Sequence, residues 1–410
     1  MTVEIVEIEA LGAQGDGVGS AAGRRVFVPL AAPGDRVSAR IEGNRGVLLE
    51  VVEPGPDRVT PSCAHYGTCG GCQLQHLSRE AYLSFKQDLV RSALAAHGMT
   101  PEIEPIWAVE PRTRRRAVFA AHRRDGEIEI GFHGRRSHRI EAIEACEVIT
   151  PGLLASLPAL KRAIAPLCPA KDGLTVTVAE TASGLDVAVN GADPKLDADR
   201  RQRAIGLGAE AGFARLSMNG DVLAQWRTPA LRTSHGEQEP APGGFLQACA
   251  SAEARMVEEV LAGVGKAKTV ADLFAGSGTF SLPLAGTASV HAVEGDGPAL
   301  EALQRSLKRA PSGRPATTER RDLFRRPLLP DELARFAAVV LDPPRAGAEA
   351  QVRMLARSRA KTVVMVSCNA QSFARDMKIL TDGGYKVRRI QPVDQFLYTP
   401  HVEIVATLAR

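Results

Sequence analysis

The last 160 or so residues repeat one pattern, in which a short apolar run is followed by a polar or glycine-rich loop and room for a helix. The runs are TVADL, SVHAVE, AAVVL, TVVMV and VEIVATLA. Buried strands that alternate with helices are typical of a doubly wound sheet, whose ligands bind at the carboxyl ends of the strands. The pattern therefore predicts a Rossmann-like α/β domain, which we assign to residues 236–410.

Two further regions precede this one in a chain of 410 residues, which is long enough for two or three separate cores. Residues 1–57 contain short alternating runs separated by glycine turns, and this pattern predicts a small β-barrel. Residues 58–235 mix helical and alternating stretches, as expected for a central α+β domain. The polar stretch HGEQEPAPGG, residues 235–244, is typical of a linker.

The composition excludes several classes of protein. No apolar run approaches the roughly 20 residues that cross a bilayer, and the N-terminus does not resemble a signal peptide. The seven cysteines are an odd number, which argues against a disulfide framework and for metal binding or catalysis. We therefore expect a cytoplasmic protein, monomeric and not associated with membranes.

The loop DLFAGSGTF contains Gly276 and Gly278, which let the backbone approach a ligand at the start of a helix. The third glycine of a dinucleotide loop is replaced by Ser281, so an ordinary tight turn is the alternative. Acids also follow three successive predicted strands: Asp272, Glu294 and Asp322. Carboxylates would repel a pyrophosphate but can bind a ribose, so the pattern favours an S-adenosylmethionine pocket.

Cys368, in VSCN, follows the apolar run TVVMV, and it could be a buried hydrophobe, a metal ligand or a nucleophile. Its polar neighbours Ser367 and Asn369 argue against an apolar core. A thiolate that adds to C6 of uracil makes C5 nucleophilic, and a base must later remove the C5 proton. Asp342, in LDPPR, follows one predicted strand, and Glu403, in HVE, lies at the start of the last one. Both residues can therefore reach the same edge of the sheet.

Three cysteines lie close together in the segment CAHYGTCGGC: Cys63, Cys69 and Cys72. Structural zinc sites usually pair two C-x2-C units, whereas three local thiolates with one remote thiolate suit an iron–sulfur cluster. Cys146 is the preferred fourth ligand and Cys168 the competitor. We expect a 4Fe-4S cluster that helps to fold an RNA-binding region, with zinc and no metal as the alternatives.

A basic stretch follows between residues 112 and 139, with nine arginines against three acids. The aromatic residues Phe119 and Phe132 lie within it. Arginines with aromatic residues suit phosphate contacts and base stacking on RNA, although a solvated charged face is the simpler alternative.

The motifs DLFAGSGTF, LDPPR, VSCN and HVE together resemble the family of RNA uracil-5 methyltransferases, which make 5-methyluridine in ribosomal and transfer RNA. The N-terminal barrel is similar to a TRAM domain, and CAHYGTCGGCQ resembles the cysteine cluster of the iron–sulfur members. The resemblance covers nearly the whole chain, and it is specific because the motifs occur in combination.

The resemblance implies that Cys368 is the nucleophile and Glu403 the base. It also implies a set of cofactor contacts: Gln247, Phe274, Glu294, Asp322 and Asp342. Thr279 and Cys249 stand where the family often has asparagine, so no asparagine role is carried to them. Ala370 replaces the usual proline after the SCN motif.

The expected function is methyl transfer from S-adenosylmethionine to C5 of a uridine in RNA, with 23S ribosomal RNA preferred as the partner. A transfer-RNA enzyme and a catalytically inactive RNA-binding or chaperone protein are the alternatives. A cytosine-5 methyltransferase is disfavoured, because its cysteine would follow a proline, whereas Cys368 follows Ser367.

Overall fold

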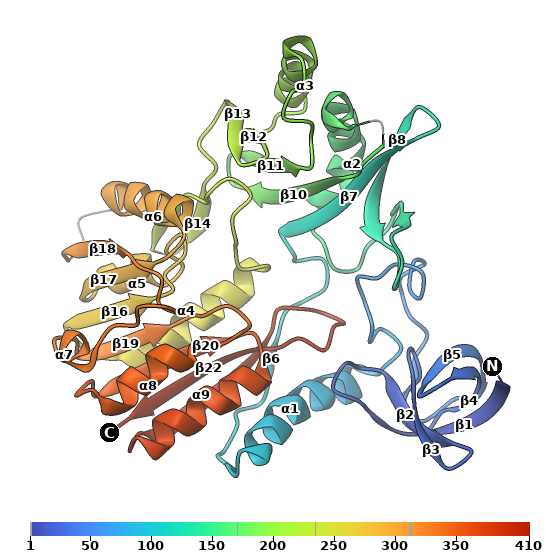
Figure 1. The fold of residues 1–410 in the computed structure, drawn as a ribbon, viewed down its shortest axis with the longest axis horizontal. Helices are drawn as coiled ribbons and strands as arrows, with labels where there is room; N and C mark the ends of the chain where they lie inside the picture. Colours follow the sequence, from blue (N-terminus) through green and yellow to red (C-terminus); the bar gives the residue numbers. More distant parts are fainter. Residues whose placement is uncertain (1, 170, 234, 311–313) are drawn as a thin grey trace.

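A computed structural model describes residues 2–169, 171–233, 235–310 and 314–410. The chain forms a small barrel, a central sheet and a C-terminal sheet covered by helices (Figure 1). No helix in these ranges is both long enough and apolar enough to span a membrane.

The N-terminal barrel is closed and has the strand order β1-β2-β3-β5-β4, as the alternating runs predict. Its strands are β1 Thr2–Leu11, β2 Gly17–Ala21, β3 Arg24–Val28, β4 Arg36–Glu42 and β5 Arg45–Glu53. Inward-facing Val6, Val26 and Val37 are fully buried. Gly19 allows β1 and β2 to cross closely, because a Cβ there would lie 2.2 Å from the carbonyl oxygen of Glu7.

The central sheet has the order β13-β12-β11-β10-β7-β8-β9 and packs against two helices and a short 3-10 turn. Its strands are β7 Arg116–Arg124, β8 Glu127–His133, β9 Ile140–Glu141, β10 Leu174–Thr181, β11 Gly184–Asn190, β12 Arg215–Met218 and β13 Asp221–Gln225. The helical elements are α2 Pro151–Ile164, η1 Ala165–Leu167 and α3 Ala198–Glu210. Alternate residues of β10, such as Val176 and Val178, are fully buried in the shared core.

The C-terminal sheet has the order β18-β17-β16-β19-β20-β22-β21-β6. Its strands are β6 Trp107–Ala108, β16 Thr269–Leu273, β17 Ser289–Glu294, β18 Ala316–Arg320, β19 Ala338–Leu341, β20 Thr362–Ser367, β21 Lys386–Asp394 and β22 Glu403–Ala409. Strands β16 to β20 pair in parallel, whereas β22 runs antiparallel to both β20 and β21. The predicted doubly wound sheet is confirmed, and the strand order reverses direction next to β16, where such sheets bind ligands.

Two apolar cores cover the two faces of this sheet. The helices are α1 Arg79–Ala96, α4 Ala250–Val264, α5 Ser281–Ala285, α6 Gly297–Arg309, α7 Pro330–Leu333, α8 Glu349–Arg357 and α9 Ala370–Asp382. Buried residues of α4, α5 and α6 belong to one core, and those of α8 and α9 belong to the other. The predicted helix after the cysteines is α1, which begins after the capping residue Ser78 and packs against α9.

The predicted linker at residues 235–244 stays a prediction, but part of the segment is folded and buried. Strand β15, Gly236–Gln238, pairs with β14, Leu231–Thr233, and Glu239 is only 5% exposed. Glu239 accepts bonds from Arg305 and Arg309 of α6, so the segment is anchored to the C-terminal domain. The assignment of residues 58–235 to one central domain stays a prediction, although β6 pairs with β21 of the C-terminal sheet and α1 packs against α9.

Candidate active site

One cavity of about 890 Å³ opens at the carboxyl ends of the parallel strands of the C-terminal sheet. Its lining includes all seven residues that the sequence places in catalysis or cofactor binding: Gln247, Phe274, Glu294, Asp322, Asp342, Cys368 and Glu403. These residues come from positions as far apart as 247 and 403, and the sheet brings them together because its strands end at a common edge.

The glycine loop after β16 forms one wall of the cavity. Gly276 has a φ of 54° and faces open space, so a side chain there would be strained and would enter the cavity. Its N–H donates to Glu294 Oε2 at 2.9 Å, and the N–H of Asp296 donates to Glu294 Oε1 at 2.8 Å. These bonds hold the carboxylate of Glu294 beside the loop, where it can bind a ribose diol. Phe274 also has a positive φ, 63°, which a non-glycine residue adopts at a cost.

Asp272 does not reach the cavity, although the sequence groups it with the acids at the strand ends. It is fully buried beneath the glycine loop, and Ser281 Oγ donates to its Oδ2 at 2.5 Å. Burial raises the pKa of Asp272 to about 7. Asp272 is therefore a buried residue that anchors Ser281 after the glycine loop, whereas the acids that line the cavity are Glu294, Asp296, Asp322, Asp342 and Glu403.

Cys368, Glu403 and Asp342 form a group of titratable side chains in the cavity, and each has a raised pKa. Cys368 lies between β20 and the start of α9, where Asn369 caps the helix. Burial raises the pKa of its thiol to about 12, and the nearby acids Glu403 and Asp342 add to this effect, whereas Arg345 opposes it. Burial also raises the pKa of Glu403 to about 7. A cationic ligand beside these groups would stabilise their charged forms.

Two bonds join the loop of Cys368 to the loop after β19. Asn369 Nδ2 and Ser372 Oγ both donate to the carbonyl oxygen of Arg345 at 3.0 Å. The DPPR segment is thereby fixed against the start of α9, and Asp342 and Cys368 face the same space. Ala370 occupies the first position of this helix without a proline.

Several cavity residues carry no signal in the sequence analysis. Phe324, which follows Asp322, lies with its ring centroid 5.4 Å from that of Phe274 and adds an aromatic wall. It is 49% exposed, as expected for a side chain that awaits a planar ligand. An aromatic residue two positions after a strand-end acid, as Phe324 stands after Asp322, is the signal that could have identified it.

The four predicted cluster cysteines lie in one region, and each is half-buried. The charges of Cys63 and Cys146 both affect the pKa of Cys69 and of Cys72, so the four thiols lie within electrostatic range of one another. Backbone N–H groups donate to Cys69 Sγ and to Cys146 Sγ, at 3.4 Å in each case. Among the described residues, however, no three His, Cys, Asp or Glu side chains are close enough to hold a metal ion. Cys168 is buried in the central core instead.

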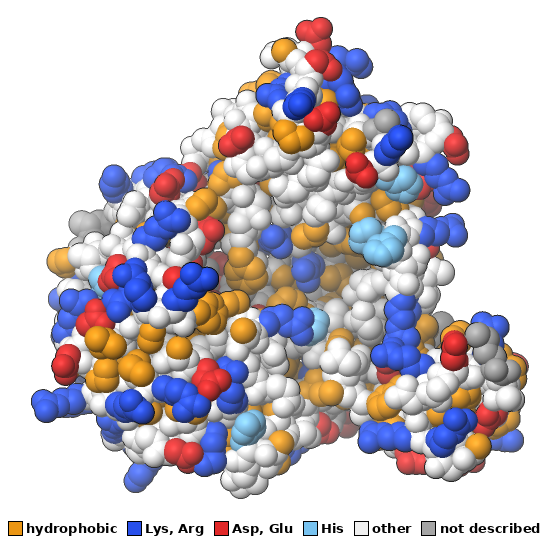
Figure 2. All heavy atoms as spheres, in the orientation of Figure 1, with side chains coloured by type: hydrophobic (Ala, Val, Ile, Leu, Met, Phe, Trp, Pro, Cys, Tyr) orange, Lys and Arg blue, Asp and Glu red, His pale blue; other side chains and the backbone are white. Residues whose placement is uncertain are grey.

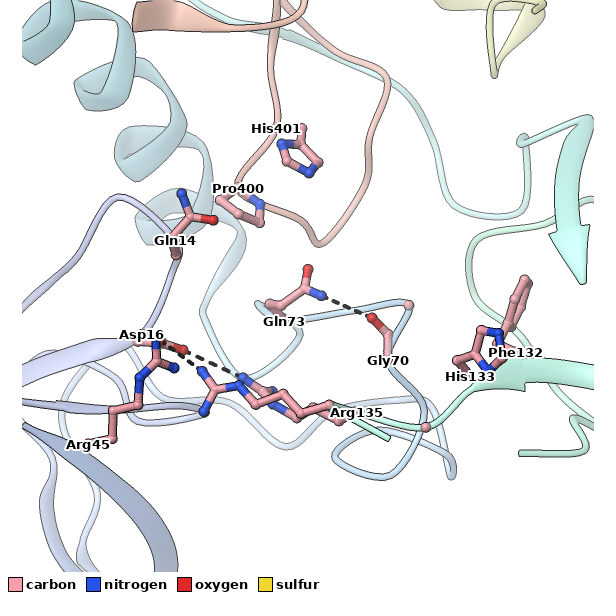
Figure 3. Close-up of a pocket in the computed structure, with 13 residues that line it drawn as sticks. Gln14, Asp16, Arg45, Gly70, Gln73, Phe132, His133, Arg135, Pro400 and His401 are labelled. Atoms are coloured by element: carbon pink, nitrogen blue, oxygen red, sulfur yellow. Dashed lines mark hydrogen bonds and ion pairs between the residues drawn. The ribbon is translucent and has the colours of Figure 1, made fainter. Parts of the chain in front are cut away.

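The basic stretch divides into structural and surface arginines. Arg115 is buried and pairs with Glu253 of α4, with 2.8 Å between Nη2 and Oε2, so it fixes the central sheet to the C-terminal domain. Arg135 and Arg136 instead line a second cavity of about 640 Å³. That space is enclosed by the barrel, the cysteine loop, the end of β8 and the loop before β22 (Figure 3).

The second cavity lies beside the loop that leads to Glu403, because His401 is one of its lining residues. Its only acid is Asp16, which faces Arg135 and Arg136, and Arg45 of the barrel approaches from the same side (Figure 3). Figure 2 shows the face hollowed between the three parts of the molecule, with basic side chains in and around the hollow. RNA contact by Arg135 and Arg136 stays a prediction, whereas the predicted base stacking on Phe119 is wrong because this residue is fully buried in the central core.

Fold and site together define a class I methyltransferase, with a strand-end cavity next to a glycine loop and a small closed barrel added to it. A solved structure with the same arrangement is the tRNA (uracil-54, C5)-methyltransferase of Pyrococcus abyssi in complex with S-adenosyl-L-homocysteine. It is 25% identical, the match covers 99% of each chain, and the TM-score is 0.77.

Sequence relatives agree with this class. The chain is 44% identical to an uncharacterized RNA methyltransferase of Agrobacterium fabrum, over 100% of both proteins. It is 34% identical to the 23S rRNA (uracil(1939)-C(5))-methyltransferase of Chromohalobacter salexigens, over 100% of this chain and 90% of that protein. The family model described as tRNA (Uracil-5-)-methyltransferase matches residues 314–410. The chain belongs to the RNA (uracil-5-)methyltransferase family.

Proposed function

We propose that this protein transfers a methyl group from S-adenosylmethionine to C5 of a uridine in RNA, with 23S ribosomal RNA as the substrate. The observation that carries the proposal is the single cavity that Cys368, Glu403 and Asp342 share with the glycine loop and Glu294. A thiol, a buried base and a ribose-binding acid in one space are the groups that this reaction requires.

The cofactor fits the wall formed by the glycine loop. Glu294 would bind its ribose hydroxyls, Phe274 and Phe324 would flank its adenine, and Gln247 and Asp322 would bind its polar groups. S-adenosylmethionine, when bound there, supplies the methyl group for C5.

Cys368 is the nucleophile in the proposed mechanism. Its thiol gives up a proton to solvent, and the sulfur lone pair forms a bond to C6 of the uracil while the C5–C6 π electrons move into an enolate. The charge of Arg345 and the N-terminus of α9 both favour the thiolate. Asp342 is the group that orients the uracil ring.

Glu403 completes the cycle after C5 has received the methyl group. Its carboxylate takes the C5 proton, the electron pair of the C5–H bond restores the C5–C6 double bond, and Cys368 leaves as a thiolate. A pKa of about 7 suits a group that must accept a proton near neutral pH.

RNA would reach this site across the second cavity. Arg45, Arg135 and Arg136 present positive charge there against a single acid, Asp16. The substrate preference rests on the relative from Chromohalobacter salexigens; the structural neighbour from Pyrococcus abyssi supports transfer RNA as the alternative.

Cys63, Cys69, Cys72 and Cys146 are proposed to hold a 4Fe-4S cluster. Their shared region and their N–H···S bonds support this, and small movements of the loops would have to bring the sulfur atoms together. Anaerobic purification should give a brown protein with about four irons per chain. A colourless protein with one zinc per chain would contradict the cluster.

The decisive experiment compares 5-methyluridines in total RNA from cells with and without the gene. Loss of one modified position in 23S ribosomal RNA, restored by the wild-type gene, is the expected result. Loss from transfer RNA would select the alternative substrate. An unchanged map, together with no methylation of total RNA by the purified protein, would reject the activity.

A further inference from the structure

Gln395, directly after β21, is the buried polar residue that joins two groups of the proposed active site. It is 1% exposed and does not line the cavity, so it cannot touch a ligand there. Its side-chain Nε2 donates to Gln247 Oε1 at 2.6 Å and to Glu403 Oε1 at 3.0 Å. One amide group therefore connects a cofactor-facing side chain with the proposed base.

The orientation of the Gln395 amide is fixed by the backbone. Its Oε1 accepts the N–H of Ala248 at 3.0 Å, so the NH₂ end must point toward Gln247 and Glu403. Its main-chain oxygen accepts from Cys249 Sγ at 3.6 Å. Gln395 is thus attached to three successive residues at the start of α4, and both hydrogens of its NH₂ group are used.

These bonds determine what its two partners can do. Because Gln247 Oε1 is occupied by an N–H donor, the NH₂ end of Gln247 is left to donate into the cavity. Because Gln395 binds Oε1 of Glu403, that oxygen is held in place. Within the described residues Oε2 of Glu403 accepts no bond, so it can receive a proton.

We propose that Gln395 is a positioning residue, which sets the amide of Gln247 for cofactor binding and the carboxylate of Glu403 for proton removal. The inference rests on the proposed function for Glu403, whereas its Gln247 half concerns cofactor binding alone. A purely structural glutamine would stabilise the fold without affecting either property.

The titration of Glu403 provides a readout specific to this role. Burial raises the pKa of Glu403, and the bond from Gln395 lowers it. The other titratable groups that face Glu403 are Asp342 and Cys368, whose pKa values its charge raises. Removal of the donor raises the pKa of Glu403 further, so the rate of proton removal should reach its plateau at higher pH.

Two variants test the proposal together. Gln395→Met removes all polar contacts of the side chain with little change in size, and Gln395→Glu keeps an acceptor for Ala248 while it replaces the NH₂ group that donates to Gln247 and Glu403. The control is Gln391→Met, which changes a buried glutamine of β21 that binds Pro105 and lies outside the cavity. Melting temperatures of all three identify any variant that does not fold.

The first measurement is calorimetric titration with S-adenosylhomocysteine. Gln395→Met should weaken binding about 5-fold, the effect of one hydrogen bond, and should have little further effect in a Gln247→Met background. Gln391→Met should bind normally. An equal loss in both backgrounds, or no loss, would overturn the link through Gln247.

The second measurement is the pH dependence of single-turnover tritium release from RNA that carries tritium at C5 of its uridines, because this release reports removal of the C5 proton by Glu403 rather than methyl transfer. The rate of the wild-type protein should rise with pH, with a midpoint near pH 7. Both Gln395 variants should have a higher midpoint, and above that midpoint their rates should approach the wild-type rate. Profiles that coincide with the wild type would overturn the link through Glu403. If the wild type methylates no RNA, the proposed function fails, and the titration still decides the role of Gln395.

Discussion

Cys368 shows how strongly the surroundings of one residue decide its chemistry. Burial and the acids Glu403 and Asp342 raise the pKa of its thiol to about 12, so the thiol form predominates at neutral pH in the protein without ligands. Activation must then accompany the binding of a cationic ligand and of the base. This arrangement protects the cysteine when no substrate is bound.

Cys368→Ala should abolish methyl transfer, by at least about 1,000-fold, because no other group in the cavity can add to C6. Cofactor binding should change little, since the glycine loop and Glu294 are intact. Single-turnover assays with labelled cofactor measure the first effect and calorimetry the second. Cys168→Ala, a change in the central core, is the matched control. Substantial activity in Cys368→Ala would rule out the covalent route.

Glu403→Gln should trap the enzyme on its substrate. The cysteine can still add and the methyl can still transfer, but without a base the C5 proton stays and Cys368 cannot leave. A protein–RNA band that survives denaturing electrophoresis is the expected result, and it should be absent in Glu403→Gln combined with Cys368→Ala. Free product at the wild-type rate would show that another group is the base.

At the level of elements, a buried ion pair fixes α1 to the end of β21. Lys86 and Asp394 are both fully buried, and Lys86 also donates to the carbonyl oxygen of Phe396 at 3.0 Å. Tyr82, one turn earlier on α1, donates to the same carboxylate and accepts from the N–H of Tyr398. The loop that leads to Glu403 is therefore held by the helix that follows the cysteines.

Lys86→Met should lower the free energy of unfolding by about 3–5 kcal/mol, because it leaves the carboxylate of Asp394 buried without a countercharge. Chemical denaturation measures this loss. The double variant Lys86→Met with Asp394→Asn should regain much of the stability, since both charges are then absent. If the double variant is less stable than Lys86→Met alone, the unpaired charge is not the cause.

Prediction of these elements succeeded where burial is periodic and failed where it is not. Short apolar runs identify five strands of the C-terminal sheet, because such runs are typical of buried strands: β16, β17, β19, β20 and β22. Strand β6 has two residues and pairs only through its contact with β21, so no local pattern identifies it. The segment at 235–244 has the composition of a linker, but contacts with α6 bury Glu239.

At the scale of the whole molecule, the cavity of the proposed active site and the basic cavity lie on either side of the loop before β22. Lining residues of the basic cavity come from the barrel, the cysteine loop, the central sheet and the C-terminal domain. An RNA that occupies it would contact every part of the chain while its target base faces Cys368.

The double variant Arg45→Ala with Arg136→Ala should weaken RNA binding about 10-fold at moderate salt. Loss of two phosphate contacts should also reduce the slope of log affinity against log salt by about 1.4. Filter binding at several salt concentrations measures both quantities. Arg353→Ala, an exposed arginine of α8 that lines neither cavity, is the control. An unchanged slope would place the RNA elsewhere.

The sequence by itself determined the sheet, the barrel, the family and seven of the residues that line the cavity, because each depends on a local motif or on a buried apolar run along one strand. Only the tertiary structure decided that Asp272 lies under the glycine loop, that Arg115 is buried in an ion pair, and that Gln395 binds Gln247 and Glu403. The bond between Gln395 and Gln247 joins residues 148 positions apart, and no pattern within a strand or helix encodes such a contact. It exists because the start of α4 and the end of β21 are packed together when the sheet is complete.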